Sequence, residues 1–277
     1  MNPRQRFIET MTFGRPDRPP FLEFSLRPAT LDNWRRQGLP PDVDVQAFFG
    51  FDPTISVPVT TGPLPRFEVK ILHQDDRYKI WIDELGALRK DFVHDREPGF
   101  VTRTWLKFPV QSRRDFLQIK HRFDPDHPDR LPPDFARWAQ QARNRTCPLR
   151  LTLHSMFWEL RDWMGFHGLC TAFYDAPDLV HQMMQFQTDF NIALCSRIFQ
   201  HVMPDWVFLQ EDMAYKTASM ISPQMVRQFM LPHYRRLASF LRDAGVPVVM
   251  LDSDGHVSEL IPIWLEAGIN AANPFEV

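Results

Sequence analysis

Acidic side chains follow two apolar segments in the last third of the sequence. Residues 207–210 and 248–251 are typical of buried strands, and each segment runs directly into carboxylates. The residues at these two ends are Glu211, Asp212, Asp252, Asp254 and His256. Because the carboxyl ends of parallel strands face one edge of a sheet, we expect these side chains to lie together. The pattern predicts a ligand pocket at that edge.

Clustered carboxylates need compensation, because like charges repel when they are brought together out of water. A metal ion, a cationic substrate, water or basic neighbours such as Lys216 and Arg27 could provide it. The alternative is that Asp252 or Asp254 caps the helix that follows, which is a common duty of Asp at a helix start. The sequence leaves both interpretations open.

Two other positions carry side chains suited to proton transfer or to contact with a ring. His154 ends the apolar segment 149–154, where an imidazole could act as an acid, a base or a ligand, although a lone strand histidine is more often structural. Trp158, with Phe157 and Trp163, could form an aromatic wall for a ligand, although packing in the core is the more ordinary role.

The composition favours a globular protein that binds a small molecule. Of 277 residues, 44% are hydrophobic, and the formal net charge of -2 gives no basic footprint for nucleic acid. Three dispersed cysteines, Cys147, Cys170 and Cys195, form no zinc or redox motif. The sequence shows no signal peptide and no membrane-spanning apolar run, so we expect a cytoplasmic protein.

The elements that would position these residues alternate between strand and helix. Strands are expected at 21–26, 54–59, 149–154, 206–210, 248–251 and 269–272. Helices are expected at 2–13, 42–49, 135–143, 158–164 and 177–202, with further helices between the last three strands. Six strands alternating with helices predict a parallel sheet with right-handed crossovers. Glu23 and Glu276 then stand at the ends of the first and sixth strands, which makes them candidate substrate contacts.

Two stretches depart from this alternation. Residues 66–92 show apolar residues at every second position on either side of Asp75 and Asp76, which predicts a β-hairpin inserted after the second strand. Residues 113–145 are charged and rich in proline, and we expect a solvated excursion there.

The motifs in the last third, taken in order, resemble the uroporphyrinogen decarboxylase superfamily. They are 211–216 (EDMAYK), 221–223 (ISP), 229–232 (FMLP), 252–256 (DSDGH), 266–268 (EAG) and 273–276 (NPFE). That superfamily contains decarboxylases of haem synthesis and methyltransferases that act with corrinoid proteins. The resemblance implies a TIM-type (β/α)₈ barrel over residues 1–277 as a single domain, truncated after about six strands and carrying the hairpin 66–92 as an insertion. It also places Tyr215 and Lys216 where relatives contact substrate.

The resemblance separates this chain from both kinds of relative. The methyltransferases carry His-x-Cys where this sequence has Asp252 and Asp254, so a thiolate zinc site is not expected. An oxygen site for a divalent metal, or a zinc site that uses His154 or His256, stays possible. The decarboxylases carry two arginines after the first strand; Arg27 matches the first of them, and Leu31 replaces the second.

Three functions follow from the resemblance. The leading one is methyltransferase-type chemistry on a small methylated or aromatic substrate, with a corrinoid protein as possible acceptor. Asp212, Asp252 and Asp254 would then orient the substrate or a hard metal, with His154 or His256 as proton carrier and Glu211 in the pocket. The second is decarboxylation of a porphyrinogen-like acid anchored by Arg27. The third is a catalytically silent binding barrel or an inactive fragment.

Overall fold

The computed structural model describes residues 1–23, 26–93 and 103–275. Its α-helices are α1 (Pro3–Met11), α2 (Pro28–Arg36), α3 (Val45–Phe49), α4 (Arg113–Ile119), α5 (Phe135–Arg143), α6 (Met156–Asp175), α7 (Pro177–Phe199), α8 (Pro223–Met225), α9 (Leu231–Asp243) and α10 (Ile261–Ala267). Its strands are β1 (Ile55–Ser56), β2 (Lys70–Gln74), β3 (Tyr78–Ile82), β4 (Leu88–Phe92), β5 (Arg103–Lys107), β6 (Leu149–His154), β7 (Trp206–Gln210), β8 (Val248–Asp252) and β9 (Ala271–Asn273).

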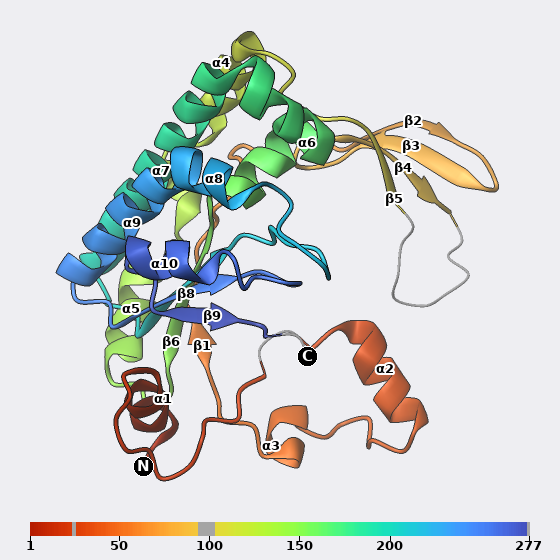
Figure 1. Ribbon diagram of the computed structural model, residues 1–277. Coiled ribbons are helices and arrows are strands. Elements are labelled where there is room, and N and C mark those ends of the chain that lie inside the picture. The colour runs from red at the N-terminus through yellow and green to blue at the C-terminus, as the bar shows by residue number, and fades with distance from the viewer. Residues whose placement is uncertain (24–25, 94–102, 276–277) are drawn as a thin grey trace.

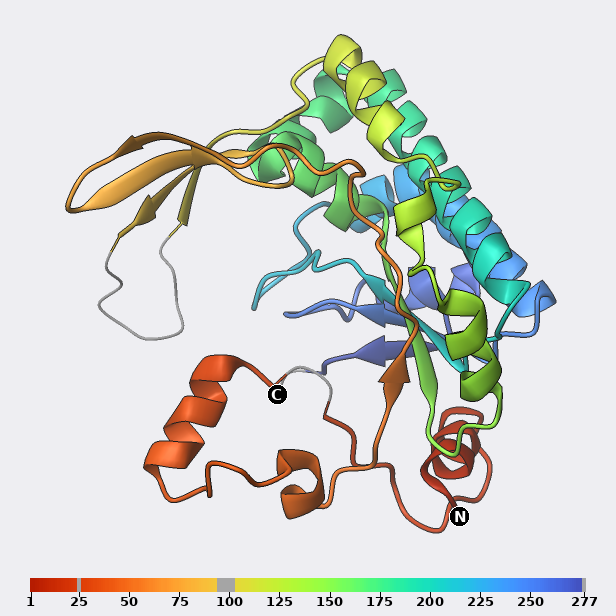
Figure 2. The same ribbon diagram turned by 180° about the vertical axis from the view of Figure 1, so that it is seen from behind.

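The main sheet is parallel and follows the order β1-β6-β7-β8-β9. Helices α4 to α10 cover one of its faces, while α1 lies against the other face, below the strands in Figure 1. A separate antiparallel sheet, β2-β3-β4-β5, projects away from this body, as Figure 2 shows from behind. The molecule therefore has an α/β architecture. Helices connect the parallel strands, and each new strand is added beside the one before it.

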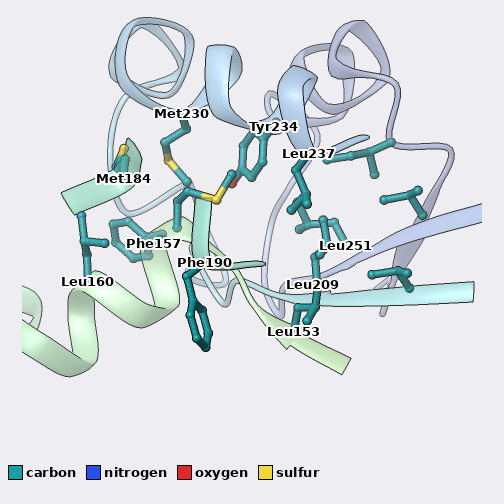
Figure 3. Close-up of a cluster of buried hydrophobic side chains, with 14 of the residues drawn as sticks. Leu153, Phe157, Leu160, Met184, Phe190, Leu209, Met230, Tyr234, Leu237 and Leu251 are labelled. Atoms are coloured by element: carbon teal, nitrogen blue, oxygen red, sulfur yellow. The ribbon is translucent and has the colours of Figure 1, made fainter. Parts of the chain in front are cut away.

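Alternation along the strands separates an apolar face from a mixed one. In β6 the three leucines are completely buried against the helices, while the three residues between them are half-buried on the opposite face. Leu153, Leu209 and Leu251 occupy one row beneath α7 and α9, where they pack with the other side chains of Figure 3. Burying a leucine contributes about 2 kcal/mol, so this face supplies the main hydrophobic core.

The opposite face is apolar only near the amino-terminal ends of its strands. Phe7 of α1 packs there against Trp206, with ring centroids 5.3 Å apart, and Phe208, Val248 and Met250 complete this small cluster. The carboxyl-terminal positions on the same face are polar. The helix α1 thus covers the amino-terminal end of this face, and the polar residues lie at its carboxyl-terminal end.

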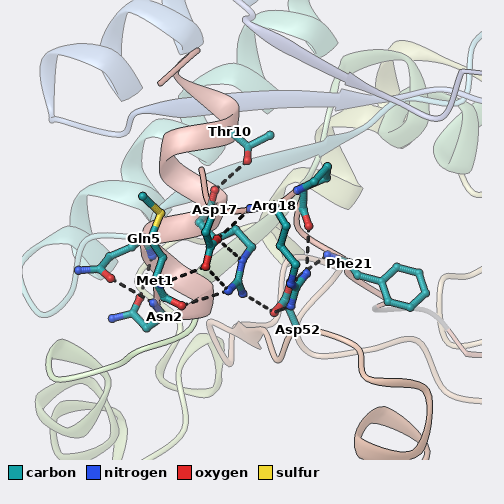
Figure 4. Close-up of polar contacts among 10 residues, drawn as sticks. Met1, Asn2, Gln5, Thr10, Asp17, Arg18, Phe21 and Asp52 are labelled. Carbon is teal, nitrogen blue, oxygen red and sulfur yellow. Dashed lines mark hydrogen bonds and ion pairs between the residues drawn. The ribbon is translucent and has the colours of Figure 1, made fainter. Parts of the chain in front are cut away.

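An ion-pair network fastens α1 to the chain that follows it. The Arg6 guanidinium donates to Asp17 and to Asp52, at 2.7 Å in each case, and Arg18 also donates to Asp52 (Figure 4). Asp52 further accepts from the Phe21 backbone N–H and donates its own N–H to the Phe21 carbonyl. These bonds fix the residues around Phe21 outside any sheet.

The expected strand over 21–26 is therefore wrong for the residues that the structure describes there. Residues 21–23 and 26 are not in a strand, and Phe24 and Ser25 lie outside the described residues. The helix α2, which the sequence did not predict, begins directly afterwards at Pro28. Where six parallel strands were expected, the described part of the chain has five, and β1 and β9 are not paired with each other there.

Inside the expected range 66–92, β2 and β3 form a hairpin that belongs to a larger sheet. β2 and β3 pair antiparallel around a turn in which the Asp75 carboxylate accepts from the N–H groups of Arg77 and Tyr78. β4 lies inside the expected range 66–92, and β5 extends this sheet beyond its expected end. The pattern concealed β4 because its polar positions are buried: Arg89 pairs with Asp91 and Asp83.

The expectation of a solvated excursion over 113–145 is wrong. Phe116, Phe123 and Phe135 are buried in the main core, and Phe116 and Phe123 contact Trp163 of α6. In α5 the charged residues lie on the outer face of a short amphipathic helix, whereas Arg130, between α4 and α5, is completely buried. Within the described ranges, no helix is both long and apolar enough to cross a membrane.

Candidate functional site

Four polar side chains form one row across the carboxyl ends of neighbouring strands. His154 of β6 is in register with Gln210 of β7, Gln210 with Asp252 of β8, and Asp252 with Asn273 of β9. Residues in register in a parallel sheet share a face, and these four, which we call the polar row, lie on the face opposite the main core. All four are half-buried. Three strand spacings give the polar row a span of about 14 Å, enough for a small molecule.

Asp252 is the central residue of the acidic part of the site, since Asp212 and Asp254 both act on it. Burial, followed by the charges of Asp212 and Asp254, raises its pKa to about 7, while Arg150 opposes this shift. The Arg150 side chain comes from β6, four residues before His154, and therefore lies on the same face as the polar row. Asp252 changes its charge near neutral pH, so it can switch between accepting and donating a proton there.

Asp212 is held in an unusual backbone conformation beside Asp252. Its φ of 42° is in the left-handed region, which Asp tolerates better than most residues. Its N–H donates to the Asp252 carbonyl at 3.1 Å, and its own carbonyl accepts from the Arg161 guanidinium at 2.7 Å. A carboxylate oxygen of Asp212 accepts from the Asp254 N–H at 3.3 Å. The three aspartates are thus brought together, as the sequence predicted.

The loops after β7 and β8 are fastened to each other. The His256 N–H donates to the Tyr215 carbonyl at 2.7 Å, and the Ser253 hydroxyl accepts from the Met213 N–H at 3.0 Å. Gly255 has φ of 88°, and a Cβ there would lie 2.6 Å from the Tyr215 carbonyl oxygen. Glycine is required at this close approach because a side chain would push the two loops apart.

Glu211 lies beneath the site rather than in it. Its carboxylate is completely buried and accepts from the N–H groups of Phe157 and Trp158, at 2.9 and 3.1 Å, and from the Tyr234 hydroxyl. Burial raises the pKa of Glu211 to about 7, although these hydrogen bonds oppose the shift. Figure 3 shows Tyr234, which belongs to α9, among the buried side chains of the main core. Glu211 therefore joins the end of β7 to the starts of α6 and α9.

His154 is oriented by a buried carboxylate. Its Nδ1 lies 2.8 Å from a carboxylate oxygen of Glu159, and its carbonyl accepts from the amides of Gln187 and Asn191 on α7. With Nδ1 engaged by Glu159, Nε2 is the ring nitrogen left for a ligand. The ring centroids of Trp158 and His154 are 5.9 Å apart. The Arg161 guanidinium lies over the Trp158 ring, 4.8 Å from its centroid.

The remaining sequence candidates are placed around this centre. Tyr215 is exposed on the β7–α8 loop, and Lys216 and His256 are exposed as well. Arg27 is exposed at the N-cap position of α2, and Glu23 precedes that helix. Phe157 and Trp163 are buried in the main core, so of the three expected aromatics only Trp158 borders the site. Glu276 lies outside the described residues.

The capping alternative for Asp252 and Asp254 is wrong. The next helix, α10, begins at Ile261 with Leu260 in the N-cap position, and no side-chain hydrogen bond caps it. The long loop between β8 and α10 leaves both aspartates at the strand end. Their placement is therefore explained by the site and not by the start of a helix.

The donor set does not fit a metal ion as it stands. Across residues 1–23, 26–93 and 103–275, no group of three or more His, Cys, Asp or Glu side chains is arranged to hold one. Asp254, one of the expected oxygen ligands, is exposed. We therefore derive no chemical step through a metal.

Sequence reasoning missed Gln210, Glu159, Asn273 and Asp162. Gln210 is the last residue of an otherwise apolar strand, and strand register places it between His154 and Asp252. Glu159 lies five residues after His154, one helical turn into α6, a spacing that could have indicated the pair. Asn273 was seen only as part of a motif. The register that unites the polar row is a property of the folded sheet.

Two comparisons with known proteins bear on this geometry. Residues 150–273, which hold the polar row and both acidic loops, match the model of the uroporphyrinogen decarboxylase (URO-D) family. A solved structure of a methyltransferase from Methanosarcina mazei is similar in fold, with a TM-score of 0.59 and 13% sequence identity. The similarity covers 98% of this chain and 75% of that one. The comparison with curated proteins finds no match.

Proposed function

We propose that this chain is a barrel enzyme of the uroporphyrinogen decarboxylase superfamily, whose model matches residues 150–273, and that it transfers a methyl group from a small substrate. The observation that carries the proposal is the polar row at the carboxyl ends of β6 to β9, because active sites of α/β barrels lie at that edge. The fold shared with the Methanosarcina mazei methyltransferase supports the same choice of chemistry.

The row favours a small polar substrate with one ring or methyl face. Gln210 and Asn273 can each donate and accept hydrogen bonds, and Asp252 can accept from a hydroxyl or an amine. Trp158 offers an apolar surface at the His154 end of the row. We propose that a methylated alcohol, amine or aryl ether lies along this row, with its heteroatom toward His154.

The chain's own residues would orient the substrate and move one proton. In methyl transfer the bond between the substrate heteroatom and the methyl carbon breaks, the methyl group passes to a nucleophile, and the heteroatom takes a proton. His154, fixed by Glu159, is the proton carrier in this scheme, and Asp252 and Asp212 hold the substrate. The nucleophile that we propose is a reduced corrinoid carried by a partner protein.

The electrostatics favour this function over decarboxylation of a porphyrinogen. Such a substrate carries many carboxylates, and Asp212, Asp252 and Asp254 would repel them at the strand ends. Arg27, the proposed anchor, is exposed at the start of α2. The three aspartates at the described strand ends thus oppose the binding that decarboxylation would need.

Methyl transfer to reduced cobalamin tests the proposal. Methanol, methylamine and methoxybenzoate would be offered in turn with cob(I)alamin, and methylcobalamin would be followed by its absorbance. We expect product with at least one donor and a loss of at least tenfold in kcat/KM for Gln210→Leu, with exposed Gln182→Leu as control. No product with any donor, together with coproporphyrinogen formed from uroporphyrinogen, would favour decarboxylation; no product in either assay would favour a silent barrel.

A further inference from the structure

Two carboxyl side chains, those of Glu159 and Asp162, gather beside His154. Glu159 is buried and contacts His154, and Asp162 follows it by three residues on the same face of α6. These residues line a narrow cavity whose other walls include Gly62, Leu85 and Phe123. The cluster thus lies between the polar row and the chain that follows β1.

The buried charge of Glu159 is directed mainly at His154. The charge of Glu159 acts on Arg130, but the Arg130 guanidinium donates to backbone carbonyls, those of Thr60, Gly62, Arg122 and Asp124. It therefore makes no hydrogen bond to the Glu159 carboxylate in the described structure. The imidazole of His154 is the group that contacts this carboxylate directly.

The other groups around His154 are neutral or belong to the same helix. The amides of Gln187 and Asn191 contact its carbonyl from α7, and the amide of Gln210 is its neighbour on β7. From α6, Arg161 opposes the negative charge, and its effect falls on Asp162. Glu159 and Asp162 of α6 therefore both act on the imidazole, and Arg161 of the same helix acts on Asp162.

The balance of these effects stabilises a positive charge on the ring. Burial alone would lower the pKa of His154, but the hydrogen bond to Glu159 and the charges of Glu159 and Asp162 outweigh it and raise the pKa above its ordinary value. Burial, reinforced by the charge of Glu159, also raises the pKa of Asp162 to about 7. Asp162 thus adds its full negative charge only as the pH passes above neutral.

We propose that Glu159 and Asp162 are positioning residues that keep His154 as an imidazolium cation at neutral pH, with its Nε2–H offered to an oxygen anion of the substrate. The substrate then carries either a carboxylate or an oxygen that becomes an anion when its methyl group leaves. This use of the cation rests on the proposed function, whereas the charge itself is a property of the free protein. His154 enters the reaction as a proton donor and not as a base.

Histidine side-chain NMR on the free protein tests the charge directly. His154 would be assigned by the signal that disappears in His154→Gln, and its ring nitrogens would be followed from pH 5 to pH 10. We expect a midpoint above the ordinary value of about 6.5. Glu159→Gln should lower it by more than one unit and Asp162→Asn by a smaller amount, while the exposed Glu259→Gln should leave it unchanged.

Each outcome decides the question. A wild-type midpoint at or below about 6.5 overturns the proposal, as does a midpoint that Glu159→Gln leaves in place. If Glu159→Gln does not fold, Asp162→Asn decides alone, and an unchanged midpoint counts against it. A shifted midpoint without methyl transfer contradicts only the proposed function; methyl transfer with an ordinary midpoint contradicts only this inference.

Discussion

The buried carboxylate of Glu211 makes stability depend on pH in a way that one substitution should remove. The pKa of Glu211 is raised from 4.5 to about 7 in the folded protein, mainly by burial. The folded state therefore binds this proton more tightly than the unfolded chain does. The stability that follows is present below pH 4.5 and is lost as the pH rises through about 7.

The size of the effect comes from the difference between the two pKa values. A shift of about 2.5 units corresponds to about 3 kcal/mol in full, of which about 2 kcal/mol is lost between about pH 5.5 and about pH 8. Glu211→Gln keeps the shape of the side chain: its carbonyl can accept from Phe157 and Trp158, and its amide can donate to Tyr234. Because an amide does not ionise in this range, the variant should not lose this stability.

Urea unfolding at several pH values between about 5.5 and 8 measures the difference. We expect the free energy of unfolding of Glu211→Gln, relative to wild type, to rise by about 2 kcal/mol across that interval. The exposed Glu259→Gln serves as the matched control and should show a constant difference. A constant difference for Glu211→Gln as well would refute the assignment of Glu211 as a buried, proton-binding structural group.

Three further predictions concern the loops, the core and the acidic site. Gly255→Ala should lower the free energy of unfolding by about 2 kcal/mol or more, and Gly245→Ala by only about 1 kcal/mol. Both glycines have positive φ, but only at Gly255 would a Cβ meet a backbone oxygen. Equal losses of stability in thermal unfolding would contradict this. Leu151→Ala should cost about 3 kcal/mol in urea unfolding because Leu151 is completely buried, and a cost under about 1 would count against the packing described. Asp252→Asn should remove the rise in kcat/KM that ionisation of Asp252 produces as the pH passes about 7, and an unchanged inflection would exclude Asp252 as its source.

The sequence predicted the core of this fold where one physical signal dominated. Strands 149–154 and 206–210 were found to the residue, because alternating or continuous apolar runs ended at carboxylates or histidine. The prediction of a first strand at 21–26 was wrong because hydrogen bonds join Phe21 to Asp52, and no local sequence pattern reveals these bonds. β4 was missed because charged residues usually indicate an exposed segment, whereas Arg89 and Asp91 are buried as an ion pair.

The candidate site divides in the same way. The gathering of Asp212, Asp252 and Asp254 was predictable, because strand ends in parallel sheets share an edge. The separation of Glu211 from them was not, since Glu211 and Asp212 are adjacent in sequence but point to different environments. The contact between Glu159 and His154 likewise depends on how α6 leaves the end of β6.

The central claim is that the polar row is where a methylated substrate reacts. Its most direct test is methyl transfer to cob(I)alamin by the wild type, Gln210→Leu and Gln182→Leu, measured side by side with the best donor. The claim predicts transfer by the wild type and by Gln182→Leu at equal rates, and at least about a tenfold lower kcat/KM for Gln210→Leu. Equal activity in all three proteins would contradict the claim and place the reaction elsewhere on the molecule.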